Sequence, residues 1–82
     1  IGLTRYLATY WADKGVRCNV ICPGGVENGQ PVEFLKEINK RIPVGRMARV
    51  DEYQSTLLWM LSDSSSYLNG AIVPVDGGRT VW

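Results

Sequence analysis

Hydrophobic and polar residues recur along the chain with two different periods, and these periods predict its secondary structure. The first apolar set has the i, i+3, i+4 spacing of an amphipathic helix and consists of Leu3, Tyr6, Leu7, Tyr10 and Trp11. Lys14 suits the negative end of that helix, and Gly15 suits the left-handed position that commonly ends one. The pattern therefore predicts a helix that closes at residues 14–15.

Two short apolar runs are predicted to be strands. Val16 to Cys22 is apolar on more than one face, as expected in a sheet that is covered on both sides. Ala71 to Val75 is the second strand. Pro74 has no amide hydrogen, which indicates an edge strand with this position facing outward.

Two further helices are predicted between the strands. The helix over residues 32–41 carries apolar residues on one face and is ended by Pro43. The helix over 51–62 begins with Asp51 and Glu52 in its first turn and is followed by three serines. The order α-β-α-α-β is an α/β pattern in which a right-handed crossover joins two parallel strands. One crossover cannot bury both faces of a sheet, so we expect further strands from outside these residues.

Length and composition limit the classes of protein. The chain has 82 residues, which is at most one small domain or a piece of one, and 45% of them are hydrophobic. No apolar run approaches 18 residues, which predicts no membrane span. The net charge is +1 with both signs interspersed, which argues against nucleic-acid binding. The first residues lack the basic region of a signal peptide, and the missing initial Met leads us to expect a truncated sequence.

The two cysteines are predicted to be unpaired. In one strand, Cys18 and Cys22 lie about 13 Å apart, whereas a disulfide needs Cα atoms within about 7 Å. Two cysteines and no histidine also argue against zinc. These features suit a reducing, cytoplasmic compartment.

Candidate chemistry lies where the first strand ends. Pro23-Gly24-Gly25 follows that strand directly, and ligands of parallel α/β sheets bind beyond the carboxyl ends of strands. Glycines there let backbone groups approach a ligand closely. For an isolated Pro-Gly-Gly a plain turn is the simpler interpretation, but the helical patterns before and after the strand and the second strand at the end of the chain remove that preference. The second strand ends in Asp76-Gly77-Gly78, which we interpret as a turn held by the aspartate rather than as a metal or phosphate site.

Several short motifs occur together in one order. They are Gly2-Leu3-Thr4-Arg5, Gly15-Val16-Arg17-Cys18-Asn19, Pro23-Gly24-Gly25-Val26, Ile42-Pro43-Val44-Gly45-Arg46-Met47, Leu61-Ser62-Asp63, Tyr67-Leu68-Asn69-Gly70 and Val75-Asp76-Gly77-Gly78. Together they resemble the last third of a short-chain dehydrogenase/reductase. The resemblance implies that residues 1–82 are the C-terminal fragment of a single NAD(P)-binding domain with a doubly wound, Rossmann-type parallel sheet. It also implies a homodimer or homotetramer built partly on residues 53–75, with Trp82 near the contact.

The resemblance assigns roles to the loop after the first strand. Backbone groups of Pro23, Gly24, Gly25 and Val26 would bind the nicotinamide carboxamide of NAD or NADP. Asn28 stands where the family often has Thr, so we include it among the cofactor-binding residues. Two more side chains, Glu27 and Gln30, lie where the family's substrate-covering loop begins. Their polarity suits a hydroxyl-rich, sugar-derived substrate; the alternative is a solvated loop.

The family's catalytic spacing occurs once, in the wrong place. Tyr10 and Lys14 have the Tyr-x-x-x-Lys spacing, but Lys14 precedes a strand whose ligand end lies about 20 Å away. We therefore assign no catalytic residue and expect the family's Ser and Tyr-x-x-x-Lys upstream of Ile1. The implied function is part of an oxidoreductase that moves a hydride between nicotinamide and a carbonyl or secondary alcohol. The alternative is a non-enzymatic remnant that serves only structure or oligomerisation.

Overall fold

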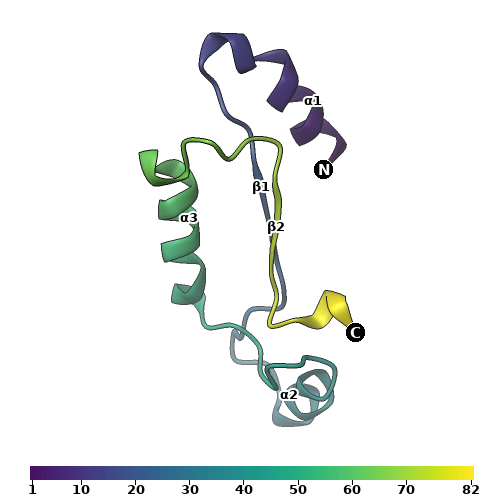
Figure 1. Cartoon of the computed structure of the whole chain (residues 1–82). Helices are drawn as coiled ribbons and strands as arrows, with labels where there is room; N and C mark the ends of the chain where they lie inside the picture. Colours follow the sequence, from purple (N-terminus) through teal and green to yellow (C-terminus); the bar gives the residue numbers. More distant parts are fainter. The chain divides into compact units, whose positions relative to one another are not determined.

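The computed structural model describes residues 1–82 (Figure 1). These residues form two compact units. The first unit comprises residues 1–21 and 54–73, and the second comprises residues 22–53 and 74–82. Because the chain passes between them three times, each unit is made of two separate stretches of sequence. The units are described in turn.

The first helix of unit one is shorter than its apolar pattern predicts. Helix α1 spans Gly2–Tyr10, and the chain then tightens into a 3-10 turn over Ala12–Lys14. Trp11 leaves the helical conformation, and its carbonyl accepts hydrogen bonds from the amides of Lys14 and Val16 at 3.0 and 3.3 Å. Gly15 has φ +74°, so the predicted left-handed end at this residue is confirmed.

The second helix of unit one ends on an arginine from a distant part of the sequence. Helix α3 spans Gln54–Leu61 and is followed by a 3-10 turn over Asp63–Ser65. The last carbonyls of a helix have no partner within it. Here the half-buried guanidinium of Arg17 donates to the carbonyls of Met60, Ser62 and Leu68, at 3.3, 3.3 and 3.0 Å. Arg17 thus holds the end of α3 and the turn after it.

The two strands are parallel neighbours in a two-stranded sheet. Strand β1 spans Val20–Pro23 and β2 spans Ile72–Val75. The amide of Val20 donates to the carbonyl of Ala71 at 2.9 Å, and the amide of Gly24 donates to the carbonyl of Val75 at 3.1 Å. The two strands therefore run in the same direction. Pro74 is exposed, as predicted for a residue that cannot donate to the ladder.

The prediction that the first strand starts at residue 16 is wrong, because two asparagine side chains interrupt the backbone ladder before Val20. The side-chain oxygen of Asn69 accepts the amide hydrogen of Cys18 at 3.0 Å, and that of Asn19 accepts the amide hydrogen of Ala71 at 2.9 Å. Residues 16–19 therefore run beside the approach to β2 with bonds from asparagine side chains and one backbone bond, the latter from the amide of Gly70 to the carbonyl of Cys18 at 2.8 Å. An apolar pattern cannot reveal this substitution.

Unit two is organised by turns around one helix. Helix α2 spans Val32–Asn39, close to the predicted 32–41. The helix predicted over 51–62 begins instead as a 3-10 turn over Val50–Tyr53 and becomes α-helical only at α3. A short 3-10 turn over Arg79–Val81 ends the chain. An isolated parallel bridge pairs Val26 with Ala48 and ties the loop after β1 to the connector before residue 50.

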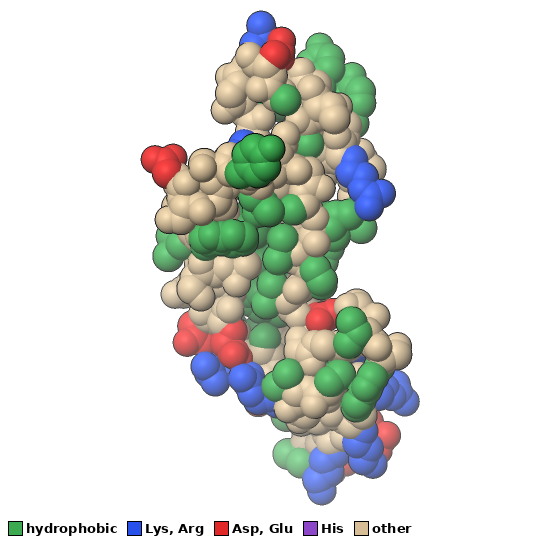
Figure 2. All heavy atoms as spheres, viewed as in Figure 1, with side chains coloured by type: hydrophobic (Ala, Val, Ile, Leu, Met, Phe, Trp, Pro, Cys, Tyr) green, Lys and Arg blue, Asp and Glu red, His purple; other side chains and the backbone are tan.

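Few side chains are buried in either unit. The buried apolar residues are Ala8 and Met60 in unit one and Ile42 and Met47 in unit two. Large apolar side chains remain exposed on α3, with Leu58 67% and Leu61 74% accessible, and apolar atoms reach the visible surface in many places in Figure 2. This exposure agrees with the expectation that one crossover cannot cover its own sheet. No helix has the length and apolar character needed to cross a bilayer.

Candidate functional site

The loop after β1 is held by its neighbours at alternate backbone groups. The amide of Gly24 donates to Val75, the carbonyl of Gly25 accepts from Ala48 at 3.0 Å, and the amide of Glu27 donates to Ala48 at 2.8 Å. Between these bonds, the N–H groups of Gly25 and Val26 donate to no other group of the chain. The loop thus combines a fixed backbone with two unengaged donors at the carboxyl end of a parallel strand.

The two glycines of this loop are required by packing within unit two. A Cβ on Gly24 would lie 2.9 Å from both Cα and Cβ of Asp76, and a Cβ on Gly25 would lie 2.8 Å from Cε of Met47. Distances this short force a shift of the neighbouring atoms, which for the Asp76 backbone is costly. The sequence analysis explained these glycines by the close approach of a ligand. The structure gives a second explanation, which is the close packing of Asp76 and Met47 against them.

The polar residues that follow have different positions. The side-chain amide of Gln30 donates to the carbonyl of Val26 at 3.1 Å, and its oxygen accepts from the amide of Asn28 at 2.6 Å. Both polar ends of Gln30 therefore close a local turn. Glu27 and Asn28 are exposed, and their side chains make no hydrogen bond within the chain. Of the two predicted substrate-binding side chains, Glu27 alone is unengaged.

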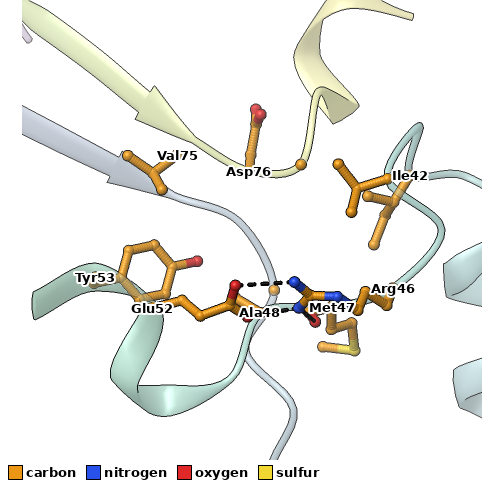
Figure 3. Close-up of a pocket in the computed structure, with 11 residues that line it drawn as sticks. Ile42, Arg46, Met47, Ala48, Glu52, Tyr53, Val75 and Asp76 are labelled. Carbon is orange, nitrogen blue, oxygen red and sulfur yellow. Dashed lines mark hydrogen bonds and ion pairs between the residues drawn. The ribbon is translucent and has the colours of Figure 1, made fainter. Parts of the chain in front are cut away.

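A pocket of about 160 Å³ lies beside this loop within unit two (Figure 3). Gly25 is the only predicted site residue among those that line it. The remaining lining residues come from the connector and from the turn after β2: Ile42, Val44, Arg46, Met47, Ala48, Glu52, Tyr53, Val75, Asp76 and Gly77. The hydroxyl of Tyr53 points into this space in Figure 3 and is buried without a hydrogen-bond partner. The pocket is thus mostly apolar with a few polar groups.

An ion pair that the sequence analysis did not predict forms one wall of the pocket. Arg46 donates through both terminal nitrogens to the carboxylate of Glu52, with Nη2 and Oε2 2.9 Å apart (Figure 3). The amide of Arg49 donates to the same carboxylate at 2.8 Å. The hydrogen bond from Arg46, followed by that from the Arg49 amide, lowers the pKa of Glu52 to about 2. Glu52 therefore joins the connector to the start of the 3-10 turn rather than serving only as a helix-starting charge.

The turn after β2 is structural, as predicted. The carboxylate of Asp76 accepts from the amide of Gly78 at 3.0 Å and from the hydroxyl of Thr80 at 2.7 Å. The Thr80 hydroxyl is the main cause that lowers the pKa of Asp76. Gly77 and Gly78 have φ +67° and +90°, and a Cβ on Gly77 would meet Ile42 at 2.8 Å. The aspartate therefore holds the turn, and the glycines fit its backbone and its packing.

The side chains set aside from catalysis are also placed. Tyr10 is the last residue of α1 and stacks on Tyr6 with ring centroids 5.5 Å apart, whereas Lys14 belongs to the 3-10 turn that follows. Tyr10 and Lys14 are thus not neighbours on one helix. Cys18 and Cys22 are free thiols. No three His, Cys, Asp or Glu side chains gather as a metal site would require.

Comparison with known proteins identifies the family. A family model described as enoyl-(acyl carrier protein) reductase matches residues 1–80. Meso-2,3-butanediol dehydrogenase of Serratia marcescens is 40% identical over 98% of this chain and 34% of its own length. Galactitol 2-dehydrogenase (L-tagatose-forming) of Cereibacter sphaeroides is 38% identical over 98% of this chain and 34% of its own. The chain belongs to the short-chain dehydrogenase/reductase family, and it spans about a third of the length of these relatives.

A solved structure shows the same arrangement in a longer chain. The short-chain dehydrogenase of Leptospira borgpetersenii, which was solved with bound NAD+, is 34% identical to this chain with a TM-score of 0.92. The match covers 96% of this chain and 31% of the longer one. The predicted α/β class and the Rossmann-type parallel sheet are therefore confirmed for the part that the chain spans.

Proposed function

We propose that this chain is the C-terminal part of one nucleotide-binding domain and provides the nicotinamide-side loop of an NAD- or NADP-dependent oxidoreductase. The observation that carries the proposal is the pair of unengaged N–H groups at Gly25 and Val26, beyond the carboxyl end of β1. Ligands of open parallel sheets bind in this position. The bonds from Gly24 and Glu27 hold the loop on either side, so the two donors are presented without a cost in backbone ordering.

The donor set suits the carboxamide of a nicotinamide. A carboxamide oxygen accepts hydrogen bonds, and neutral backbone N–H groups donate them without adding charge next to a ring that changes its own charge during the reaction. The bound cofactor supplies the hydride chemistry, and the residues of this chain orient the ring. We propose no proton-transfer role for any side chain of residues 1–82. The absence of side chains on Gly24 and Gly25 lets the loop pack against Asp76 and Met47, which fixes the backbone that presents the two donors.

The substrate proposed for the intact protein is a small molecule with hydroxyl groups. Glu27 is exposed and unengaged, next to the loop that would hold the ring, and a carboxylate accepts hydrogen bonds from hydroxyl groups. Relatives named for galactitol and for meso-2,3-butanediol support this class. Gln30 contributes by closing the turn beneath Asn28 rather than by direct contact.

The proposed assembly is a homodimer or homotetramer that covers α3. This helix exposes apolar side chains in several directions, with Leu57, Leu58 and Trp59 47%, 67% and 43% accessible. A helix that is apolar on all sides is normally covered by more than one neighbour. A second copy of the same helix is one such neighbour, and a two-fold contact would bring like residues together.

The cofactor proposal can be tested on individual amide groups. We would titrate the isotope-labelled chain with NADH, NADPH, nicotinamide mononucleotide and AMP while recording backbone amide NMR signals. The Gly25 and Val26 amides should shift with the first three ligands and not with AMP, because only the nicotinamide end engages this loop. Shifts confined to other residues, or equal shifts with AMP, would contradict the proposed role.

A matched pair of variants separates the donor from the side chain. Val26→Pro removes one unengaged N–H, whereas Val26→Ala keeps it and removes only the branched side chain. We expect Val26→Pro to weaken nicotinamide binding by about fivefold to tenfold, the value of one net hydrogen bond, and Val26→Ala to have a smaller effect. Circular dichroism of both variants checks that the fold survives. Equal losses in the two variants would show that the N–H is not used.

A further inference from the structure

The chain contains two Asn-Gly pairs, Asn28-Gly29 and Asn69-Gly70. Gly29 and Gly70 have φ +70° and +75°, and both asparagine residues are exposed to solvent. Asparagine followed by glycine is the pair in which the side-chain amide is lost most readily, because glycine puts no side chain in the way of the attacking backbone nitrogen. The surroundings of the two pairs, however, differ completely.

We propose that Asn28 is a site of spontaneous deamidation and that the fold protects Asn69 from the same reaction. The backbone nitrogen of Gly29, having lost its proton, attacks the side-chain carbonyl carbon Cγ of Asn28. The new C–N bond closes a five-membered succinimide, and the bond from Cγ to the side-chain nitrogen breaks to release ammonia. Water then opens the ring at either carbonyl and leaves aspartate or isoaspartate. One water is consumed and one ammonia is released, with no redox change.

The surroundings of Asn28 leave both reacting groups free. The Asn28 side chain makes no hydrogen bond within the chain, and the amide of Gly29 donates to none of its groups. A Cβ built on Gly29 would have no heavy atom within 4 Å, so the space around the attacking nitrogen is open. Gln30 holds the amide of Asn28 and the carbonyl of Val26, which anchors the turn on both sides of the reactive bond without covering it.

The surroundings of Asn69 engage every group that the reaction needs. Its Oδ1 accepts from the amide of Cys18 at 3.0 Å, and its Nδ2 donates to the carbonyl of Ala8 at 2.8 Å. The attacking nitrogen, on Gly70, donates to the carbonyl of Cys18 at 2.8 Å. Ala8 also lies 3.3 Å from the position of a Cβ on Gly70, so the space is filled. All three hydrogen bonds must break before the ring can close.

Modification at position 28 changes the charge of the loop. Replacing the neutral amide by a carboxylate takes the formal net charge of the chain from +1 to 0, since the acidic residues rise from 8 to 9 against 9 basic ones. The new charge would stand next to Glu27. Its effect on cofactor binding rests on the proposed function: a second carboxylate beside the nicotinamide loop would disfavour the negatively charged cofactor. The deamidation itself does not depend on that function.

The experiment compares the two sites in one sample. The chain is incubated in mildly alkaline buffer and digested with trypsin, which places Asn28 in peptide 18–36 and Asn69 in peptide 50–79. Mass spectrometry follows the replacement of NH2 by OH, and fragmentation separates Asn28 from Asn19. Each hydrogen bond that must break lowers the population of the reactive conformation of Asn69 by a few-fold. We therefore expect modification of Asn28 to be at least about tenfold faster than that of Asn69.

Two controls keep the test decisive. In denaturing urea both Asn-Gly pairs should react at similar rates, because the protection of Asn69 comes from the fold. Gly29→Ala should slow the reaction at position 28, since a methyl group there hinders the attacking nitrogen; circular dichroism verifies its fold. Equal rates at the two sites in the folded chain would overturn the proposal, as would a difference that persists in urea. Neither result bears on nicotinamide binding, which the assay does not include.

Discussion

Replacing Arg17 with Met should loosen the end of α3 and the turn after it. The variant keeps an apolar stem and removes the guanidinium, which donates to the carbonyls of Met60, Ser62 and Leu68 and, at 3.4 Å, to the hydroxyl of Ser65. A hydrogen bond from a charged donor contributes about 1.5–3 kcal/mol, but Arg17 is only half-buried and water can replace part of the set. We therefore expect a loss of about 2 kcal/mol, or roughly 30-fold in the local opening equilibrium.

Amide hydrogen exchange measures this opening where it occurs. The amides of Ser65, Ser66 and Leu68 form the turn that Arg17 supports and should exchange roughly 30-fold faster in Arg17→Met, whereas amides of α1 serve as the internal reference. Arg17→Lys should fall between the two, because one ammonium cannot reach three separated carbonyls as a planar guanidinium does. Unchanged exchange in Arg17→Met, or full protection in Arg17→Lys, would refute this reasoning.

Three further predictions concern the pocket wall, the loop and the helix surface. Since the pKa of Glu52 is about 2 in the folded chain against 4.5 otherwise, its stabilising contribution should be complete above pH 4.5 and lost as the pH falls through about 2; a carboxyl NMR titration with a midpoint near 4.5 would contradict the ion pair. Gly24→Ala should destabilise the chain by about 1–3 kcal/mol because its Cβ meets the Asp76 backbone, and thermal unfolding compares it with Gly29→Ala, whose Cβ has space and which bears only the strain of a positive φ. Trp59→Glu should dissociate any oligomer built on α3, and sedimentation that shows a monomeric wild type or an unchanged variant would show that this surface serves another purpose.

Features that depend on neighbouring residues could be predicted from the sequence. The i, i+3, i+4 spacing located α2 within two residues of its observed end, and the left-handed Gly15 and the Asp76 turn follow from local backbone chemistry. The residues that determine each of these features lie within a few positions of one another, so their pattern is visible in the sequence. The parallel pairing of β1 and β2 is not local, but it followed from the order of the elements and the right-handed crossover between them.

Features that depend on distant partners could not be predicted. The late start of β1 is due to Asn69, whose side-chain oxygen accepts a hydrogen bond from the amide of Cys18, 51 residues earlier in the sequence. The end of α3 is held by Arg17, which lies 43 residues before Met60. In the candidate site, Gly24 and Gly25 carry a packing role that requires knowledge of Asp76 and Met47. A charge pair such as Arg46 and Glu52, six residues apart across a turn, has no periodic signal.

The bridge between Val26 and Ala48 closes a long loop that comprises residues 27–47. The backbone hydrogen bonds from Glu27 to Ala48 and from Ala48 to Gly25 hold the two ends of this loop together, whatever residues lie between them. Once its base is closed, doubling the length of such a segment costs only about 0.6 kcal/mol in chain entropy. Residues 27–47 can thus vary in length and composition while the backbone at the end of β1 keeps its geometry, because the bonds that hold that backbone do not involve the residues between them.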